Sequence, residues 1–135
     1  MKNSLNQTSQ TDQIASTLLG KKVSSKETYT PEILVAVPRH ENRKQYGITN
    51  DNLPFKGWDV WHCYEFSTLT QNGVPVTRVL KLRYNCNNDF LVESKSLKLY
   101  LNSFNMTRTG ENTEDCLKIC KELIEKDLSE KLHTT

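Results

Sequence analysis

The sequence lacks the segments that mark several broad classes of protein. No apolar run of about seven residues follows Lys2, as a secretory signal would require, and no stretch approaches the roughly 20 apolar residues of a membrane span. The net charge is only +2, without the strong basic stripe typical of nucleic-acid binders. We therefore expect a cytoplasmic protein that contacts neither a membrane nor, directly, a nucleic acid.

Generic catalytic signatures are also missing. The chain has no GxGxxG or Walker-type loop, no HExxH and no GxSxG. Its four cysteines, Cys63, Cys86, Cys116 and Cys120, include no CxxC pair. Cys116 and Cys120 would share a helix face, as two metal ligands could, but no histidine lies nearby in the sequence. We interpret them as small core residues and predict no metal site.

The composition divides the 135 residues into a polar beginning and a remainder that can form a core. Residues 1–17 are almost all polar and cannot bury enough apolar surface to offset their ordering entropy, which predicts a disordered arm. Residues 18–135 suffice for a single domain. Within them, Arg39, Arg43 and Lys44 form a short basic group that we expect to be mostly solvated.

The middle of the chain has the pattern of a β-hairpin over residues 58–84. Asn72-Gly73 is a strong hairpin turn signal, and the residues after it alternate between apolar and polar from Val76 to Tyr84. In the first strand, we expect two apolar faces: Val60, Tyr64 and Phe66 on one, and Trp61, Cys63 and Leu69 on the other. The preceding residues 20–57 are expected to be largely loop-like, apart from a buried run at 33–37.

Two further elements follow the hairpin. Residues 91–104 fit a strand and a helix equally well, and Ser94 or Ser96 is a candidate helix cap. Residues 113–131 have the apolar spacing of an amphipathic helix, with Asn112 or Thr113 as its cap. A lone hairpin covered by two helices leaves an open sheet edge. The chain therefore looks truncated or dependent on another chain.

Glu93 is the most informative single residue. It follows the apolar pair Leu91-Val92 and precedes a possible helix start, where free N–H groups can hold a carboxylate. Two acceptor oxygens in one plane would suit a guanine-like edge, which presents a ring N–H beside an exocyclic amine. A simple capping acid is the other interpretation. Nearby Lys95 and Lys98 would suit a phosphate, or would be ordinary solvated lysines.

A family resemblance bears on these alternatives. The run Glu93-Ser94-Lys95-Ser96-Leu97-Lys98-Leu99-Tyr100 resembles the signature of the NADPH-dependent 7-cyano-7-deazaguanine reductases. The continuation to Asn105, the segment Val37-Pro38-Arg39 and the segment 51–55 resemble the first module of the two-module members. The resemblance implies an α+β T-fold: antiparallel strands backed by two helices, assembled side by side into larger sheets. It favours the helix at 94–104, and it implies a second hairpin, which is missing here.

The resemblance also implies an activity. The family reduces the nitrile of 7-cyano-7-deazaguanine to the amine 7-aminomethyl-7-deazaguanine, a precursor of the queuosine base of tRNA, using two molecules of NADPH. By that resemblance, Val92, Glu93 and Ser94 would line the substrate pocket, and Ser94 and Lys95 would approach NADPH. A cysteine thiolate adds to the nitrile in this family, and an aspartate supplies a proton.

The chain departs from the family pattern at the nucleophile. Thr70 stands where single-module members carry the cysteine, and no aspartate follows at the needed spacing. We therefore predict no catalytic residue in this chain, and we expect Cys63, within a strand, not to substitute. The hypothesis is an incomplete first module, at 18–135, that binds substrate and needs a second T-fold module or a homo-oligomer. The alternative is a non-catalytic purine-binding or assembly module.

Overall fold

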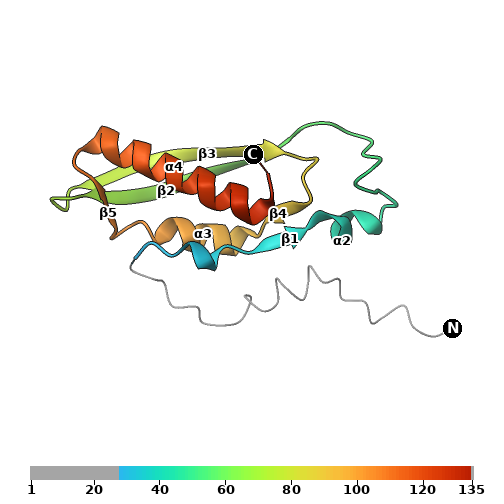
Figure 1. The fold of residues 1–135 in the computed structure, drawn as a ribbon, viewed down its shortest axis with the longest axis horizontal. Coiled ribbons are helices and arrows are strands. Elements are labelled where there is room, and N and C mark those ends of the chain that lie inside the picture. Colours follow the sequence, from blue (N-terminus) through green and yellow to red (C-terminus); the bar gives the residue numbers. More distant parts are fainter. Residues whose placement is uncertain (1–27, 135) are drawn as a thin grey trace.

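The computed structural model describes residues 28–134, so the predicted polar arm at 1–17 lies outside the described residues. No helix in this part of the chain is both long enough and apolar enough to cross a membrane. The elements run in this order (Figure 1): η1 (Pro31–Ile33), β1 (Ala36–Pro38), α2 (Arg39–Lys44), β2 (Trp58–Thr70), β3 (Pro75–Asn85), β4 (Phe90–Val92), α3 (Ser94–Asn102), β5 (Arg108–Gly110) and α4 (Thr113–Leu132).

The long β2–β3 hairpin confirms the prediction for residues 58–84, and α4 lies across one face of it (Figure 1). The short strand β5 pairs in parallel with the end of β2, so the sheet has the order β3-β2-β5. A separate two-stranded sheet pairs β1 with β4. The chain thus has the α+β T-fold arrangement of a hairpin backed by two helices, and the implied second hairpin has no counterpart within residues 28–134.

One predicted detail of β2 is wrong, and a β-bulge explains it. The register between β2 and β3 shifts between Cys63 and Phe66. An extra residue in one strand reverses which side chains face the core beyond it. Phe66 is therefore buried on the same side as Trp61 and Cys63, whereas Val60 and Tyr64 are exposed on the opposite face.

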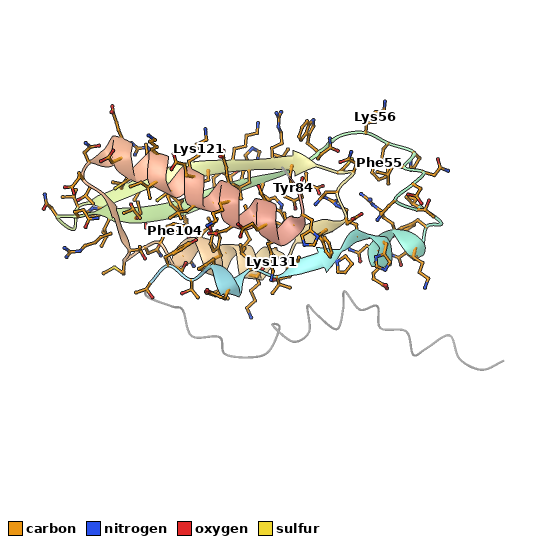
Figure 2. The ribbon with its side chains drawn as sticks, in the orientation of Figure 1. Phe55, Lys56, Tyr84, Phe104, Lys121 and Lys131 are labelled. Carbon is orange, nitrogen blue, oxygen red and sulfur yellow. The ribbon has the colours of Figure 1, made fainter. Side chains whose placement is uncertain are left out.

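The core lies between the hairpin and the helices α3 and α4. Phe104, which follows α3 (Figure 2), makes edge contacts with the rings of Phe66 and Tyr100. Both Cys116 and Cys120 are buried on α4, as expected of small core residues. The buried cluster consists of Leu34, Phe66, Tyr84, Val92, Leu97, Tyr100, Leu101, Phe104, Cys120, Ile124, Leu128 and Leu132.

The lead-in segment is more ordered than its sequence suggested. It forms η1, β1 and α2, and the expectation of solvated arginines is wrong, because Arg39 and Arg43 are only 5% and 9% exposed. Arg39 forms an ion pair with Asp59 and donates two hydrogen bonds to the side-chain oxygen of Asn88, at 2.8 and 3.0 Å. Burial of a guanidinium is tolerated here because such partners replace water.

A second anchor ties the start of the described chain to the helices. The hydroxyl groups of Tyr29 and Tyr100 both donate to the same carboxylate oxygen of Asp127 on α4, the latter at 2.7 Å. Burial, followed by the hydrogen bond to Asp127, raises the pKa of both tyrosines above the ordinary value. The folded chain therefore keeps these protons at a pH where the unfolded chain loses them.

We predict that the fold loses stability as the pH rises above about 10, where unfolded tyrosines ionise. Below that pH the two tyrosines make their full contribution to the free energy of unfolding, because they are protonated in both the folded and the unfolded chain. Urea unfolding between pH 8 and 11.5 measures the slope. The slope should be shallower in Tyr100→Phe and unchanged in Tyr64→Phe, since Tyr64 is exposed. Equal slopes in the two variants would contradict the prediction.

Candidate functional site

A pocket of about 340 Å³ lies between β2 and the outer face of α3. Because β5 pairs with β2 only at Leu69 and Thr70, no described strand covers the pocket-side edge of β2 near residues 61–65. Unpaired backbone groups of such an edge can bind a planar polar ligand. The lining residues are Trp61, His62, Cys63, Tyr64, Glu65, Ser94, Leu97, Lys98, Leu101 and Asn102.

A larger groove, of about 770 Å³, lies between β3 and α4. It contains none of the four residues that the sequence motif placed at a ligand, Val92, Glu93, Ser94 and Lys95. The smaller pocket contains Ser94 and adjoins the junction of β4 with α3. We therefore take the smaller pocket as the candidate site, although it is not the largest hollow.

Glu93 occupies the junction between β4 and α3 and caps the helix. Its two carboxylate oxygens accept hydrogen bonds from the backbone N–H groups of Lys95, at 3.0 Å, and Ser96, at 2.7 Å. The interpretation of Glu93 as a capping acid is therefore confirmed, and the candidate caps Ser94 and Ser96 are wrong. Each oxygen still has acceptor capacity for a ligand.

The backbone around Glu93 is held from the β1 side. The N–H of Glu93 donates to the carbonyl of Val35, at 2.9 Å. The hydroxyl of Ser96 donates to the carbonyl of Glu93, at 2.8 Å, and accepts from the N–H of Val35, at 3.0 Å. These bonds fix the plane in which the Glu93 carboxylate lies.

The four predicted site residues, Val92 to Lys95, differ in their position relative to the pocket. Val92 is buried in the core, and its side chain does not line the pocket. Ser94 is exposed and lines the pocket, whereas Glu93 and Lys95 are half-buried beside it. Only Ser94 is thus placed on the pocket wall itself.

From the sequence, Lys98 was considered only for a phosphate, and neither Asn102 nor Glu65 was singled out. Lys98 and Asn102 follow Ser94 at steps of four along α3, so the three side chains share one helix face. That spacing is a signal in the sequence that could have identified them. Glu65 lies beside the β2 bulge, which re-aims the strand, and no local pattern predicts a bulge.

The two side chains considered for nucleophilic chemistry have structural surroundings. Thr70 is buried, and its hydroxyl accepts a hydrogen bond from the N–H of Val74 at 3.0 Å, within the hairpin turn. Burial raises the pKa of the Cys63 thiol, which disfavours the reactive thiolate. Neither side chain has the environment of an activated nucleophile.

Comparisons with known proteins agree with this picture. Residues 25–135 match the family model described as "Nitrile reductase, 7-cyano-7-deazaguanine-reductase N-term". The chain is similar to proteins named NADPH-dependent 7-cyano-7-deazaguanine reductase from Rickettsia bellii (42% identical over 120 residues, 89% of this chain and 42% of the relative) and Desulfotalea psychrophila (45% over 111 residues, 82% and 38%). A relative from Colwellia psychrerythraea is also 45% identical over 111 residues, 82% of this chain and 37% of the relative. The chain therefore spans about two fifths of the length of these curated relatives.

We predict that Cys63 reacts more slowly with iodoacetamide at pH 7.5 than glutathione does, because its raised pKa leaves less thiolate. The rate should increase as the pH rises. Intact-protein mass spectrometry measures the modification. The difference between the wild-type chain and Cys63→Ser gives the part that occurs at Cys63 and not at the three buried cysteines. Rapid alkylation of Cys63 below pH 7 would contradict the prediction.

Proposed function

Because this chain belongs to the family of 7-cyano-7-deazaguanine nitrile reductase N-terminal modules, we propose that it supplies the substrate-binding half of such an enzyme. The enzyme would reduce the nitrile of 7-cyano-7-deazaguanine with NADPH to 7-aminomethyl-7-deazaguanine, for queuosine synthesis in tRNA. We also propose that residues 18–135 act as one module. Its place of action would be the cytoplasm, where its free cysteines stay reduced.

The geometry of Glu93 carries this proposal. Two helix N–H groups hold its carboxylate at a set angle, next to Ser94 on the wall of a pocket of about 340 Å³. The remaining acceptor positions lie in the carboxylate plane and suit the adjacent ring N–H and exocyclic amine of a guanine-like base. Glu93 would bind this edge, Ser94 would line the pocket, and the backbone of Val92 would support both.

In this proposal, NADPH contacts side chains at the site and not the backbone N–H groups at the start of α3. The N–H groups of Lys95, Ser96 and Leu97 already donate to Glu93, so they are not available to a phosphate. The exposed hydroxyl of Ser94 and the ammonium groups of Lys95 and Lys98 would contact the cofactor. When bound, NADPH supplies hydride; the residues of this chain bind and orient.

A second T-fold module, or further copies of this chain, would complete the site. The chain lacks an activated nucleophile among residues 28–134, and its pocket borders the open edge of β2. On the helix-free face of the hairpin, Trp58 and Tyr64 are 52% and 74% exposed. Large exposed aromatic side chains on one face of a sheet are consistent with a protein contact. We propose that the partner module covers this region and contributes the cysteine and the aspartate.

The buried Thr70 and the raised pKa of Cys63 agree equally with the alternative, a non-catalytic purine-binding or assembly module. The enzyme half and the assembly module would respond differently when a second module is added. An enzyme half would regain turnover with that module, and the turnover would require Glu93. An assembly module would associate with it and remain inactive.

We predict that the chain binds 7-cyano-7-deazaguanine in titration calorimetry and that Glu93→Ala abolishes the binding. Since Glu93 also caps α3, Glu93→Ser is the matched control: serine keeps a cap but lacks the planar carboxylate. Both variants should lose binding, whereas only Glu93→Ala should lose stability, by about 1 kcal/mol. Full binding by Glu93→Ser would show that Glu93 only caps the helix.

We further predict no amine formation when this chain alone is mixed with NADPH and the nitrile, because the thiolate and proton donor are missing. Addition of the C-terminal part of the Rickettsia bellii relative should restore turnover, and Glu93→Ala should remove it. Measurable turnover by the chain alone would contradict the first claim. Association without turnover would favour the non-catalytic alternative.

A further inference from the structure

The hydroxyl group of Tyr84 joins two parts of the structure that meet at the candidate site. Tyr84 lies near the end of β3 (Figure 2) and is only 5% exposed. Its hydroxyl oxygen accepts two hydrogen bonds, each of 3.2 Å, from the indole N–H of Trp61 and from the backbone N–H of Val92. One buried oxygen thus contacts both the hairpin sheet and the β1–β4 sheet.

The Val92 N–H needs this partner because of the register of β4. Glu93 donates its N–H to Val35 on the β1 side, and Val92 pairs with Ala36. In an antiparallel ladder, the residue next to a hydrogen-bonded pair directs its N–H away from that partner strand. The N–H of Val92 therefore points toward the hairpin sheet, where the Tyr84 hydroxyl takes the place of a third strand.

One donor lines the candidate site and the other directly precedes Glu93. Val92 directly precedes Glu93, whose carboxylate we assign to the purine edge, and Trp61 lines the pocket wall on β2. The Tyr84 ring is itself held, because the Arg39 guanidinium lies 5.6 Å from its centroid and is fixed by Asp59 and Asn88. A movement of the Tyr84 hydroxyl would shift Val92 and Trp61 together.

We propose that Tyr84 is a positioning residue that sets the angle of the Glu93 carboxylate against the Trp61 wall and thereby the selectivity for a guanine-like edge. This inference rests on the proposed function, since it deepens the role of the same pocket. Tyr84 does not line that pocket and touches no ligand there. Its effect passes through the backbone of Val92 and the indole of Trp61.

Tyr100 offers a matched control for the loss of a buried hydroxyl. It belongs to the same core cluster, is fully buried, and donates its hydroxyl to Asp127 on α4. Both Tyr84→Phe and Tyr100→Phe remove one oxygen from this core. Only Tyr84→Phe removes an acceptor from Val92 and Trp61.

The experiment measures hydrogen exchange and ligand selectivity in the wild-type chain and in both variants. By NMR, the Val92 amide and the Trp61 indole N–H should exchange at least about tenfold faster in Tyr84→Phe, beyond any general destabilisation. By calorimetry, the wild-type chain should prefer 7-cyano-7-deazaguanine over its analogue without the exocyclic amine by at least about tenfold. That ratio should fall at least threefold in Tyr84→Phe and stay unchanged in Tyr100→Phe.

A ratio of affinities does not depend on the folded fraction, so a purely structural role of Tyr84 would leave it unmoved. Unchanged selectivity in Tyr84→Phe, or an equal loss in Tyr100→Phe, overturns the proposal. If the wild-type chain binds neither ligand, the proposed function of the isolated chain is rejected. The selectivity role of Tyr84 is then rejected with it, whereas unchanged selectivity in a chain that binds overturns the role of Tyr84 alone.

Discussion

The candidate site depends on how the chain satisfies the backbone N–H groups between β4 and α3. Val92 donates to the hydroxyl of Tyr84, Glu93 donates to Val35, and the first turn of α3 donates back to Glu93. A buried N–H without a partner costs about as much free energy as a lost hydrogen bond. These bonds therefore hold the junction in one conformation and place Glu93 beside the pocket.

The carboxylate of Glu93 caps α3, and the same carboxylate is the group that we propose binds the ligand. A shorter serine or aspartate would cap α3 as well as Glu93 does. A glutamate whose oxygens are each held by one N–H also presents a planar acceptor pair at a set angle. Because this orientation is already present before a ligand arrives, binding would not require the side chain to lose further conformational freedom. In the proposed function, the bonds that stabilise the helix start would also orient the carboxylate for recognition.

The polar and apolar surfaces of the chain agree with the proposal that it supplies one part of a binding site and another module supplies the rest. The pocket opens along an uncovered part of β2, and exposed aromatic side chains lie on the helix-free face of the same hairpin. The two residues considered as nucleophiles have structural contacts. Thr70 accepts a hydrogen bond within the hairpin turn, and Cys63 packs against the core. These features support the proposal that the chain binds and orients a ligand while another module supplies the reacting groups.

Local patterns in the sequence determined the hairpin at 58–84, the amphipathic α4 and, with the family motif, the helix α3, because alternation and four-residue spacing depend only on neighbouring residues. The sequence also offered Asn112 or Thr113 as the cap of α4, and the structure has Asn112. Tertiary contacts decided the rest. The β2 bulge moved Phe66 to the core face, and partners distant in sequence buried Arg39. The bond between Tyr84 and Val92 also depends on how two sheets pack, and the alternation within either strand carries no information about that packing.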